Sequence, residues 1–314
     1  MYPLARSPTG FGCGKLRRMP KAHANGIEIE YACYGREHAR PLLLLRGLGT
    51  QLIQWDPRLC ERIADAGHRL VIFDNRDVGL STHFSEAAVP QLAGVARALA
   101  EGRRPEVPYT LDDMADDVVG LMDALGFADA HVAGISMGGM IVQQVAIRHP
   151  ERVRSLTSIM SSTSEPGLPG PTPEAQAALM EPAPGEREAY LDYSVRTGRC
   201  FTGDRFPFDA EAQRELAGRV FDRAFDPDGV ARQMAAVVAS GSRRQALARV
   251  RTPALVIHGS ADPLIPPAGG EATARAIPGA RLELIQGMGH DLPEGAWPAL
   301  VDAIVAHTRS AETR

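Results

Sequence analysis

The sequence lacks most of the features that mark metal-binding, secreted or membrane proteins. Its four cysteines, Cys13, Cys33, Cys60 and Cys200, show no C-x-x-C or mixed Cys/His spacing, so no metal site is predicted. Two disulfides would be possible, but no apolar signal segment indicates secretion, and this favours free thiols. No hydrophobic run approaches the length of a membrane span. We therefore expect a cytoplasmic protein without a membrane span.

An excess of charge of one sign is also missing. The chain has 38 acidic and 34 basic residues, and the net charge of −4 gives no electrostatic reason to expect DNA or RNA as a partner. With 44% hydrophobic and 23% charged residues, the composition is ordinary for a globular protein. A length of 314 residues suits one large α/β domain, or one domain that carries an insertion. The sequence is compatible with a monomer or a homo-oligomer.

Short apolar runs bounded by turn residues predict a mostly parallel sheet. Asn25-Gly26 separates two strand-like runs and is the strongest hairpin signal in the chain. Helical spacing predicts helices over 58–66 and over 110–125, the latter closed by Gly126. Strands are predicted over residues 21–24, 27–34, 42–45, 69–73, 131–133, 154–159, 253–258 and 281–285. Because helices separate most of these strands, βαβ crossovers and an α/β fold are expected.

One segment, residues 161–249, interrupts this alternation. It opens with a stretch rich in Ser, Pro and Gly and contains no convincing strand. Amphipathic helical pieces are expected over 186–196, 209–225 and 229–240. We predict that 161–249 forms a cap over a core of residues 20–160 and 250–314; the alternative is an independent helical excursion. Residues 1–19, which include three glycines, are expected to form a flexible leader.

The most informative motif is Gly134-Ile-Ser136-Met-Gly138, between a predicted strand and a predicted helix. A serine on a sharp strand-to-helix turn projects its hydroxyl above the sheet edge, and the crowded turn needs small residues two positions to either side. The N-terminus of the helix adds oriented N–H groups and positive potential beside the hydroxyl. Ser136 is therefore a candidate nucleophile.

A serine hydroxyl is a poor nucleophile at neutral pH, so it needs a base and a carboxylate that orients the base. Asp262 lies in the turn after the predicted strand 253–258, and His290 lies in the loop after 281–285. Groups that follow separate strands of a parallel sheet meet at its carboxyl edge. Among the nine histidines, only His290 has this order and context; His83, for example, has no nearby acid in an expected loop. Asp262 and His290 are therefore the predicted acid and base.

From about residue 20 to its end, the chain resembles the α/β-hydrolase-fold serine hydrolases, whose triad follows the order Ser, Asp, His. The turn from Asp74 to Ser81 (DNRDVGLS) matches the D-x-R-x-x-G-x-S motif of that superfamily, and we expect Asp74 and Arg76 to pair within it. Three stretches look most like anthracycline-type methyl-ester hydrolases and related carboxylesterases, namely Leu42–Trp55, Gly287–Pro293 and Ala306–Ser310. The resemblance implies an α/β-hydrolase fold, with a mostly parallel twisted sheet flanked by helices, a helical cap insertion and no cofactor.

The resemblance also implies an oxyanion hole made by the backbone N–H groups of Met137 and Leu48. Each such donor lowers the barrier by about 3 kcal/mol. Many relatives carry His-Gly where this chain has Arg46-Gly47. We expect Arg46 to pair with a buried acid, and attraction of an anionic substrate group is the alternative. The expected substrate pocket comprises Arg46, Met140, Met160, Leu264 and Met288.

The favoured hypothesis is a cofactor-independent serine hydrolase that cleaves small-molecule carboxylic esters through an acyl-enzyme. An enol-lactonase, a carbon–carbon bond hydrolase or a perhydrolase would share the same triad and is the alternative. A haloalkane dehalogenase is disfavoured because its nucleophile would be an aspartate at the position of Ser136. A non-catalytic binding protein is disfavoured because such proteins usually lose a triad member, whereas this chain has all three.

Overall fold

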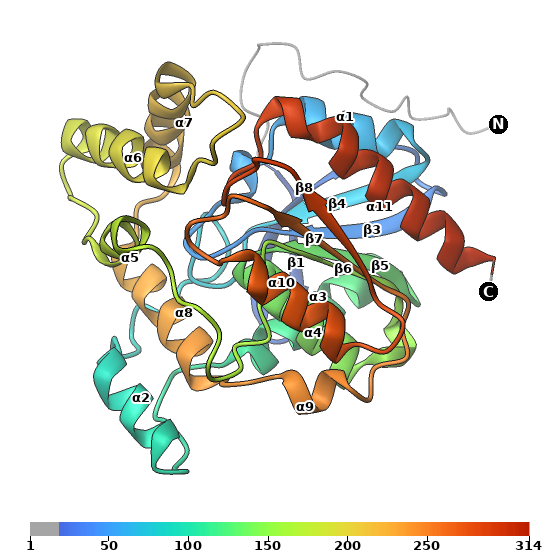
Figure 1. Cartoon of the computed structure of the whole chain (residues 1–314), viewed down its shortest axis with the longest axis horizontal. Coiled ribbons are helices and arrows are strands. Elements are labelled where there is room, and N and C mark those ends of the chain that lie inside the picture. The colour runs from blue at the N-terminus through green and yellow to red at the C-terminus, as the bar shows by residue number, and fades with distance from the viewer. Residues whose placement is uncertain (1–18, 314) are drawn as a thin grey trace.

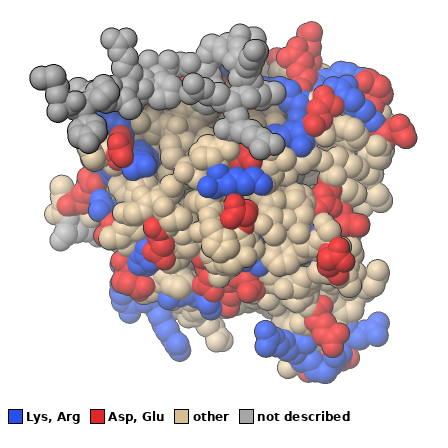
Figure 2. Space-filling model, turned by 180° about the vertical axis from the view of Figure 1, so that it is seen from behind, with Lys and Arg blue, Asp and Glu red and all other residues tan. Residues whose placement is uncertain are grey.

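The computed structural model of the chain describes residues 19–313. The predicted leader lies outside the described residues except for Met19, which packs against an apolar core. Within residues 19–313, no helix is both long enough and apolar enough to cross a membrane. Acidic and basic side chains lie interspersed over the face shown in Figure 2, as the nearly balanced charge predicts.

Eight strands form a single sheet in the order β1-β2-β4-β3-β5-β6-β7-β8 (Figure 1). The strands are β1 (Lys21–Ala24), β2 (Ile27–Tyr34), β3 (Arg40–Leu45), β4 (His68–Phe73), β5 (Ala130–Ile135), β6 (Val153–Ile159), β7 (Ala254–Gly259) and β8 (Arg281–Ile285). β2 is antiparallel to β1 and to β4, whereas β3 to β8 run parallel. The hairpin turn has positive φ at Asn25 (48°) and Gly26 (78°), as a type I′ turn requires. The predicted mostly parallel sheet is confirmed.

Helices cover both faces of the sheet and enclose two apolar cores. The helices outside the segment between β6 and β7 are α1 (Pro57–Asp65), α2 (Leu92–Ala100), α3 (Leu111–Ala124), α4 (Met137–Arg148), α10 (Pro267–Ala276) and α11 (Trp297–Glu312). β3 shows how a strand serves both cores: Leu43 and Leu45 face the core under α3 and α4, and Leu42 and Leu44 face the core under α1 and α11. This two-sided burial explains the continuous apolar run.

Between β6 and β7 the chain forms helices and no strand. These are α5 (Pro173–Met180), α6 (Arg187–Phe201), α7 (Ala210–Arg223), α8 (Pro227–Ala239) and α9 (Arg244–Leu247). Figure 1 shows α5 to α8 gathered with α2 beyond one end of the sheet. The backbone N–H of His290 donates to Phe201 O at the end of α6 (2.7 Å), and that of Gly49 donates to Gln233 Oε1 of α8 (2.8 Å). The segment 161–249, called the helical insertion below, therefore contacts the loops at the carboxyl ends of the strands.

The sequence prediction gives no bounds for α2, α5, α9, α10 and α11. α2 lies between β4 and α3, and α5 begins inside the Ser/Pro/Gly-rich stretch. α5 carries recognisable start signals, because the Thr172 side chain accepts a hydrogen bond from Ala175 N and Pro173 occupies the first turn. The three predicted helical pieces of the insertion correspond to α6, α7 and α8, with α6 continuing to Phe201.

Candidate active site

Ser136 occupies a strained turn between β5 and α4. Its backbone lies at φ 55° and ψ −119°, a conformation that costs a non-glycine residue about 1–3 kcal/mol. The flanking glycines are required by space: a Cβ on Gly134 would lie 2.2 Å from Gly138 O, and one on Gly138 would lie 2.6 Å from Arg46 O. The predicted sharp strand-to-helix turn therefore forms, with Ser136 at the N-terminus of α4.

Asp262 and His290 meet above the ends of β7 and β8. His290 Nδ1 lies 2.8 Å from Asp262 Oδ2, and the second carboxylate oxygen accepts the N–H groups of Leu264 and Ile265, both at 2.9 Å. Burial alone would raise the pKa of Asp262, but the charges and hydrogen bonds of His290 and His258 outweigh burial and hold this pKa at about 2. Asp262 is thus an ionised, fixed acceptor for one nitrogen of His290 at neutral pH.

A second histidine adjoins the same carboxylate. His258, buried in β7, places Nε2 2.8 Å from Ile265 O and 3.5 Å from Asp262 Oδ2. The spacing of four residues between His258 and Asp262 is visible in the sequence, but it does not by itself predict this contact. Asp262 therefore lies between two imidazoles.

The Ser136 hydroxyl is free in the described part of the chain, where it makes no hydrogen bond to His290 or to any other residue. Such contacts are often long in ligand-free enzymes and shorten when substrate binds. The hydroxyl faces the loop after β3, because a Cβ on Gly47 would lie 3.6 Å from Ser136 Oγ. The first residue of α4, Met137, has no intrahelical acceptor for its N–H. Ser136 thus adjoins Met137 and Gly47, the residue that precedes the other expected donor, Leu48.

The expected pocket residues occupy different parts of the site. Met160 and Met288 belong to the core under α1 and α11, whereas Met140 belongs to the core under α3 and α4. Leu264 lies beside the triad acid through its hydrogen bond to Asp262. Arg46 departs from expectation, because no carboxylate among the described residues pairs with it. The expected pairing of Arg46 with a buried acid is therefore wrong.

Asp291, next to His290 in the chain, is held in an unfavourable setting. Burial raises the pKa of its carboxyl to about 6, against a smaller lowering by the hydrogen bond from Gly289 N and by the charge of His290. The pKa values of the two acids near His290 are therefore shifted in opposite directions: that of Asp262 is lowered and that of Asp291 is raised.

The turn after β4 is held by hydrogen bonds to Asp74 from Leu80 N (2.9 Å) and Ser81 Oγ (2.7 Å), but not by the expected pair of Asp74 with Arg76. Asp74 pairs with Arg223 of α7 (2.7 Å), while Arg76 pairs with Asp117 of α3 (2.6 Å). The predicted pairing of Asp74 with Arg76 is wrong, because each side chain instead anchors a helix distant in sequence. Gly79 is required here: it has φ 62°, and a Cβ would lie 2.0 Å from Asp74 Oδ2.

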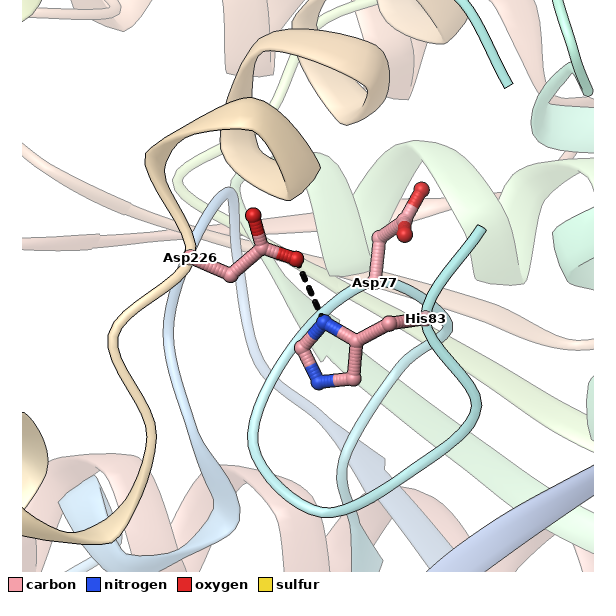
Figure 3. Close-up of side chains that lie close together, drawn as sticks. All are labelled: Asp77, His83 and Asp226. Carbon is pink, nitrogen blue, oxygen red and sulfur yellow. Dashed lines mark hydrogen bonds and ion pairs between the residues drawn. The ribbon is translucent and has the colours of Figure 1, made fainter. Parts of the chain in front are cut away.

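A second set of ion pairs joins the same turn to α8. The carboxylate of Asp77 is fully buried. It accepts hydrogen bonds from Nε and Nη2 of Arg232, both at 2.9 Å, and from the Tyr109 hydroxyl at 2.6 Å. His83 Nδ1 lies 2.5 Å from Oδ2 of Asp226, the residue that caps α8 (Figure 3). The absence of an acid near His83 in the sequence was misleading, since Asp226 is 143 residues away. We call Asp74, Asp77 and His83 with Arg223, Asp226 and Arg232 the clamp.

Asp77, His83 and Asp226 also lie close enough to hold a metal ion, with one ligand atom of each within 4.8 Å of the others. However, both oxygens of Asp77 already accept hydrogen bonds from the Arg232 guanidinium. A cation bound there would face that positive charge and would have to displace it. This donor set therefore fits an arginine better than a metal.

Comparison with known proteins agrees with this geometry. A family model described as the alpha/beta hydrolase fold matches residues 40–295. Rhodomycin D methylesterase DauP of Streptomyces sp. (strain C5) is 33% identical over 293 residues, which cover 86% of this chain and 91% of that protein. 3-Oxoadipate enol-lactonase 2 of Acinetobacter baylyi is 26% identical, covering 84% of this chain and 86% of that protein. The resemblance to methyl-ester hydrolases is confirmed.

A solved structure extends the comparison. The enol-lactonase from Burkholderia xenovorans LB400 is 25% identical and superposes with a TM-score of 0.65, covering 94% of this chain and 100% of that chain. The match covers nearly the whole chain, and the expected α/β-hydrolase fold, a mostly parallel sheet flanked by helices, is confirmed.

Proposed function

The chain belongs to the alpha/beta hydrolase family and is a hydrolase enzyme, and from this premise we propose that it cleaves carboxylic esters with a Ser136–Asp262–His290 triad. The observation that carries the proposal is the 2.8 Å contact between His290 Nδ1 and an ionised Asp262, at the sheet edge where Ser136 occupies its strained turn. A carboxylate bound to Nδ1 leaves Nε2 of the imidazole available as a base.

In the proposed reaction, Ser136 Oγ attacks the ester carbonyl while His290 Nε2 takes its proton. The tetrahedral oxyanion is bound by the N–H groups of Met137 and Leu48. His290 then protonates the departing alkoxide, which leaves as the alcohol. A water molecule, deprotonated by His290, attacks the acyl-enzyme and releases the carboxylic acid with regeneration of the Ser136 hydroxyl. No step requires a cofactor.

The helical insertion acts in this proposal as a cap over the core formed by residues 20–160 and 250–314. Support comes from its contacts to the loops that carry the reactive groups. It accepts the N–H of His290 through Phe201 O and that of Gly49 through Gln233, and Arg205 N donates to Gly287 O (3.2 Å). A cap held this way would shield the acyl-enzyme from bulk water and shape the substrate pocket.

Lactone hydrolysis is the second candidate activity, and it is favoured by the similarity to two enol-lactonases. A lactone is an internal ester, so the same triad would open it and the leaving alcohol would stay attached to the acyl group. A panel of methyl esters and lactones of matched carbon number would separate the two activities by the ratio of their kcat/KM values.

Labelling with a fluorophosphonate tests the triad. We expect a covalent adduct on the peptide that contains Ser136, formed at a rate that falls sharply in His290→Ala. Ser136→Ala is the matched control and should remain unlabelled under the same conditions. If intact wild-type protein gave no adduct, or if the label mapped to another serine, the proposed mechanism would be wrong.

A further inference from the structure

Arg46 is a half-buried cation without an anion among the described residues. It follows directly on β3, and its guanidinium stacks 4.7 Å from the centre of the Trp55 ring. Its Nε is buried and makes no hydrogen bond, and no carboxylate within residues 19–313 pairs with this side chain. Removing an unpaired charge from water is costly, and stacking on one aromatic ring offsets only part of that cost.

The other arginines with buried guanidinium atoms have partners: Arg40 pairs with Glu312 (2.6 Å), although its Nη1 makes no hydrogen bond. Arg76, Arg223 and Arg232 each pair with an aspartate. Arg243 has no carboxylate partner either, but it donates to Gln143 Oε1, Ser162 O, Ser164 Oγ and Gly241 O at 2.8–3.3 Å. Arg46 is thus exceptional among the non-exposed arginines of the described chain.

The surroundings of Arg46 offer no internal counterion. The nearest acidic group that affects it is the Cys60 thiol, and burial raises the pKa of that thiol to about 12. Burial lowers the pKa of Arg46 to about 10, so the guanidinium is still charged at pH 7 beside a neutral thiol. Trp55 Nε1 is a second buried donor with no acceptor in the described chain. Two unpaired donors therefore lie together on one loop.

That loop also borders the nucleophile. Arg46 immediately precedes Gly47, whose added Cβ would lie 3.1 Å from Ser136 Cβ, and Leu48, the proposed oxyanion donor. An anion held by Arg46 would therefore be bound by the same loop that carries the proposed oxyanion donor.

We propose that Arg46 binds a carboxylate of the substrate, so that the preferred substrates are esters or lactones bearing a free carboxylate on the acyl side. This inference rests on the proposed function of the Ser136 site. A guanidinium stacked on a ring presents a flat edge that matches a carboxylate, and such charged hydrogen bonds form best where water is excluded.

Two esters that differ only in the distal charge test the proposal. Methyl hexanoate is neutral, and monomethyl adipate has the same acyl length and ends in a carboxylate. We expect wild-type kcat/KM to be higher for monomethyl adipate. In Arg46→Met this value should fall about ten- to hundredfold, the range for a charged hydrogen bond, while that for methyl hexanoate should stay within about twofold. Arg46→Lys should recover part of the loss.

Arg62→Met is the matched control. Arg62 also stacks on a tryptophan, with its guanidinium carbon 5.6 Å from the Trp297 ring centre, but it is exposed. This variant should treat both esters as the wild type does. Equal losses on both esters in Arg46→Met, or no wild-type preference for the charged ester, would overturn the proposal.

Binding of adipate itself separates this inference from the proposed function. Isothermal titration should detect adipate binding to wild type and Arg62→Met, and a loss of at least tenfold in affinity in Arg46→Met. If wild type cleaved neither ester and still bound adipate through Arg46, the carboxylate site would stand and the esterase proposal would fail. If Arg46→Met bound adipate as tightly as wild type, the carboxylate site would be rejected.

Discussion

Two regions at the carboxyl edge of the sheet differ in how well their charged groups are paired. In the clamp, each charged side chain has a partner of opposite charge, as in Asp74 with Arg223 and Asp77 with Arg232. Around Ser136 and His290, three features are unfavourable to folding: the positive φ of Ser136, the unpaired Arg46 and the half-buried Asp291 with its raised pKa. Strain and unpaired charge of this kind cluster where proteins act on ligands.

The two regions are connected through the helical insertion. The clamp joins α7 and α8 of the helical insertion to the turn after β4, and Gln233 of α8 also fixes Gly49 in the loop that carries Arg46. Stability contributed by the clamp can therefore offset the cost of the site. The comparison predicts that substitutions in the clamp destabilise the protein, whereas selected substitutions around Ser136 stabilise it while reducing activity.

The largest effect is expected from removing the nucleophile. Ser136→Ala and Ser136→Gly should both lower kcat by about 10⁴-fold or more, because both remove the attacking oxygen. Ser136→Gly should also be more stable than Ser136→Ala by about 1 kcal/mol, since glycine tolerates φ 55° while alanine retains the strained Cβ. Urea denaturation of the pair measures this difference. Equal stabilities would show that the turn stores no strain, and the comparison of regions would lose its first support.

The next largest effect is expected in the clamp. Asp77→Asn leaves the Arg232 guanidinium buried without its carboxylate and should reduce the free energy of unfolding by about 3–5 kcal/mol. Asp222→Asn is the matched control, because Asp222 pairs with Arg187 on the exposed surface of the insertion, and its loss should leave the free energy of unfolding close to the wild-type value. Equilibrium denaturation in urea at pH 7 compares the two. Similar costs would remove the distinction that we draw for the clamp.

Much of the fold follows from local patterns in the sequence. The apolar run Leu42–Leu45 predicts a strand buried on both faces, and the Asn25-Gly26 pair predicts the hairpin, because in each case the signal and the structure involve neighbouring residues. The placement of Asp262 and His290 after successive strands also suffices to bring them together, since parallel strands end at one edge.

The partners of single charges could not be predicted in this way. Asp74 and Arg76 are two residues apart and invite a local pair, yet Arg223 and Asp117 bind them from helices that are 149 and 41 residues away. Arg46 shows the opposite failure, because the general need to pair a buried charge predicts an acid that the described chain does not supply. Such pairings depend on how α3 and the insertion pack against the turn after β4, and a single sequence carries no signal for that packing.

The smallest expected effect is the change in stability when Asp291 loses its charge. The pKa of Asp291 is raised to about 6 by burial, so the folded state binds a proton more tightly than the unfolded state between pH 4 and pH 6. The stability contributed by Asp291 is therefore full below about pH 4 and is lost as the pH rises through 6. Asp291→Asn removes the ionisation and should stabilise the protein by about 1–2 kcal/mol at pH 7.5, with little effect at pH 4.

The exposed Asp302→Asn is the control and should change the unfolding free energy by less than about 0.5 kcal/mol at either pH. Thermal or urea unfolding at the two pH values gives the answer. A stabilisation that is equal at both pH values would indicate that the amide improves packing, whereas a loss of stability at pH 7.5 would show that the ionised carboxylate is favourable and would place Asp291 with the clamp residues.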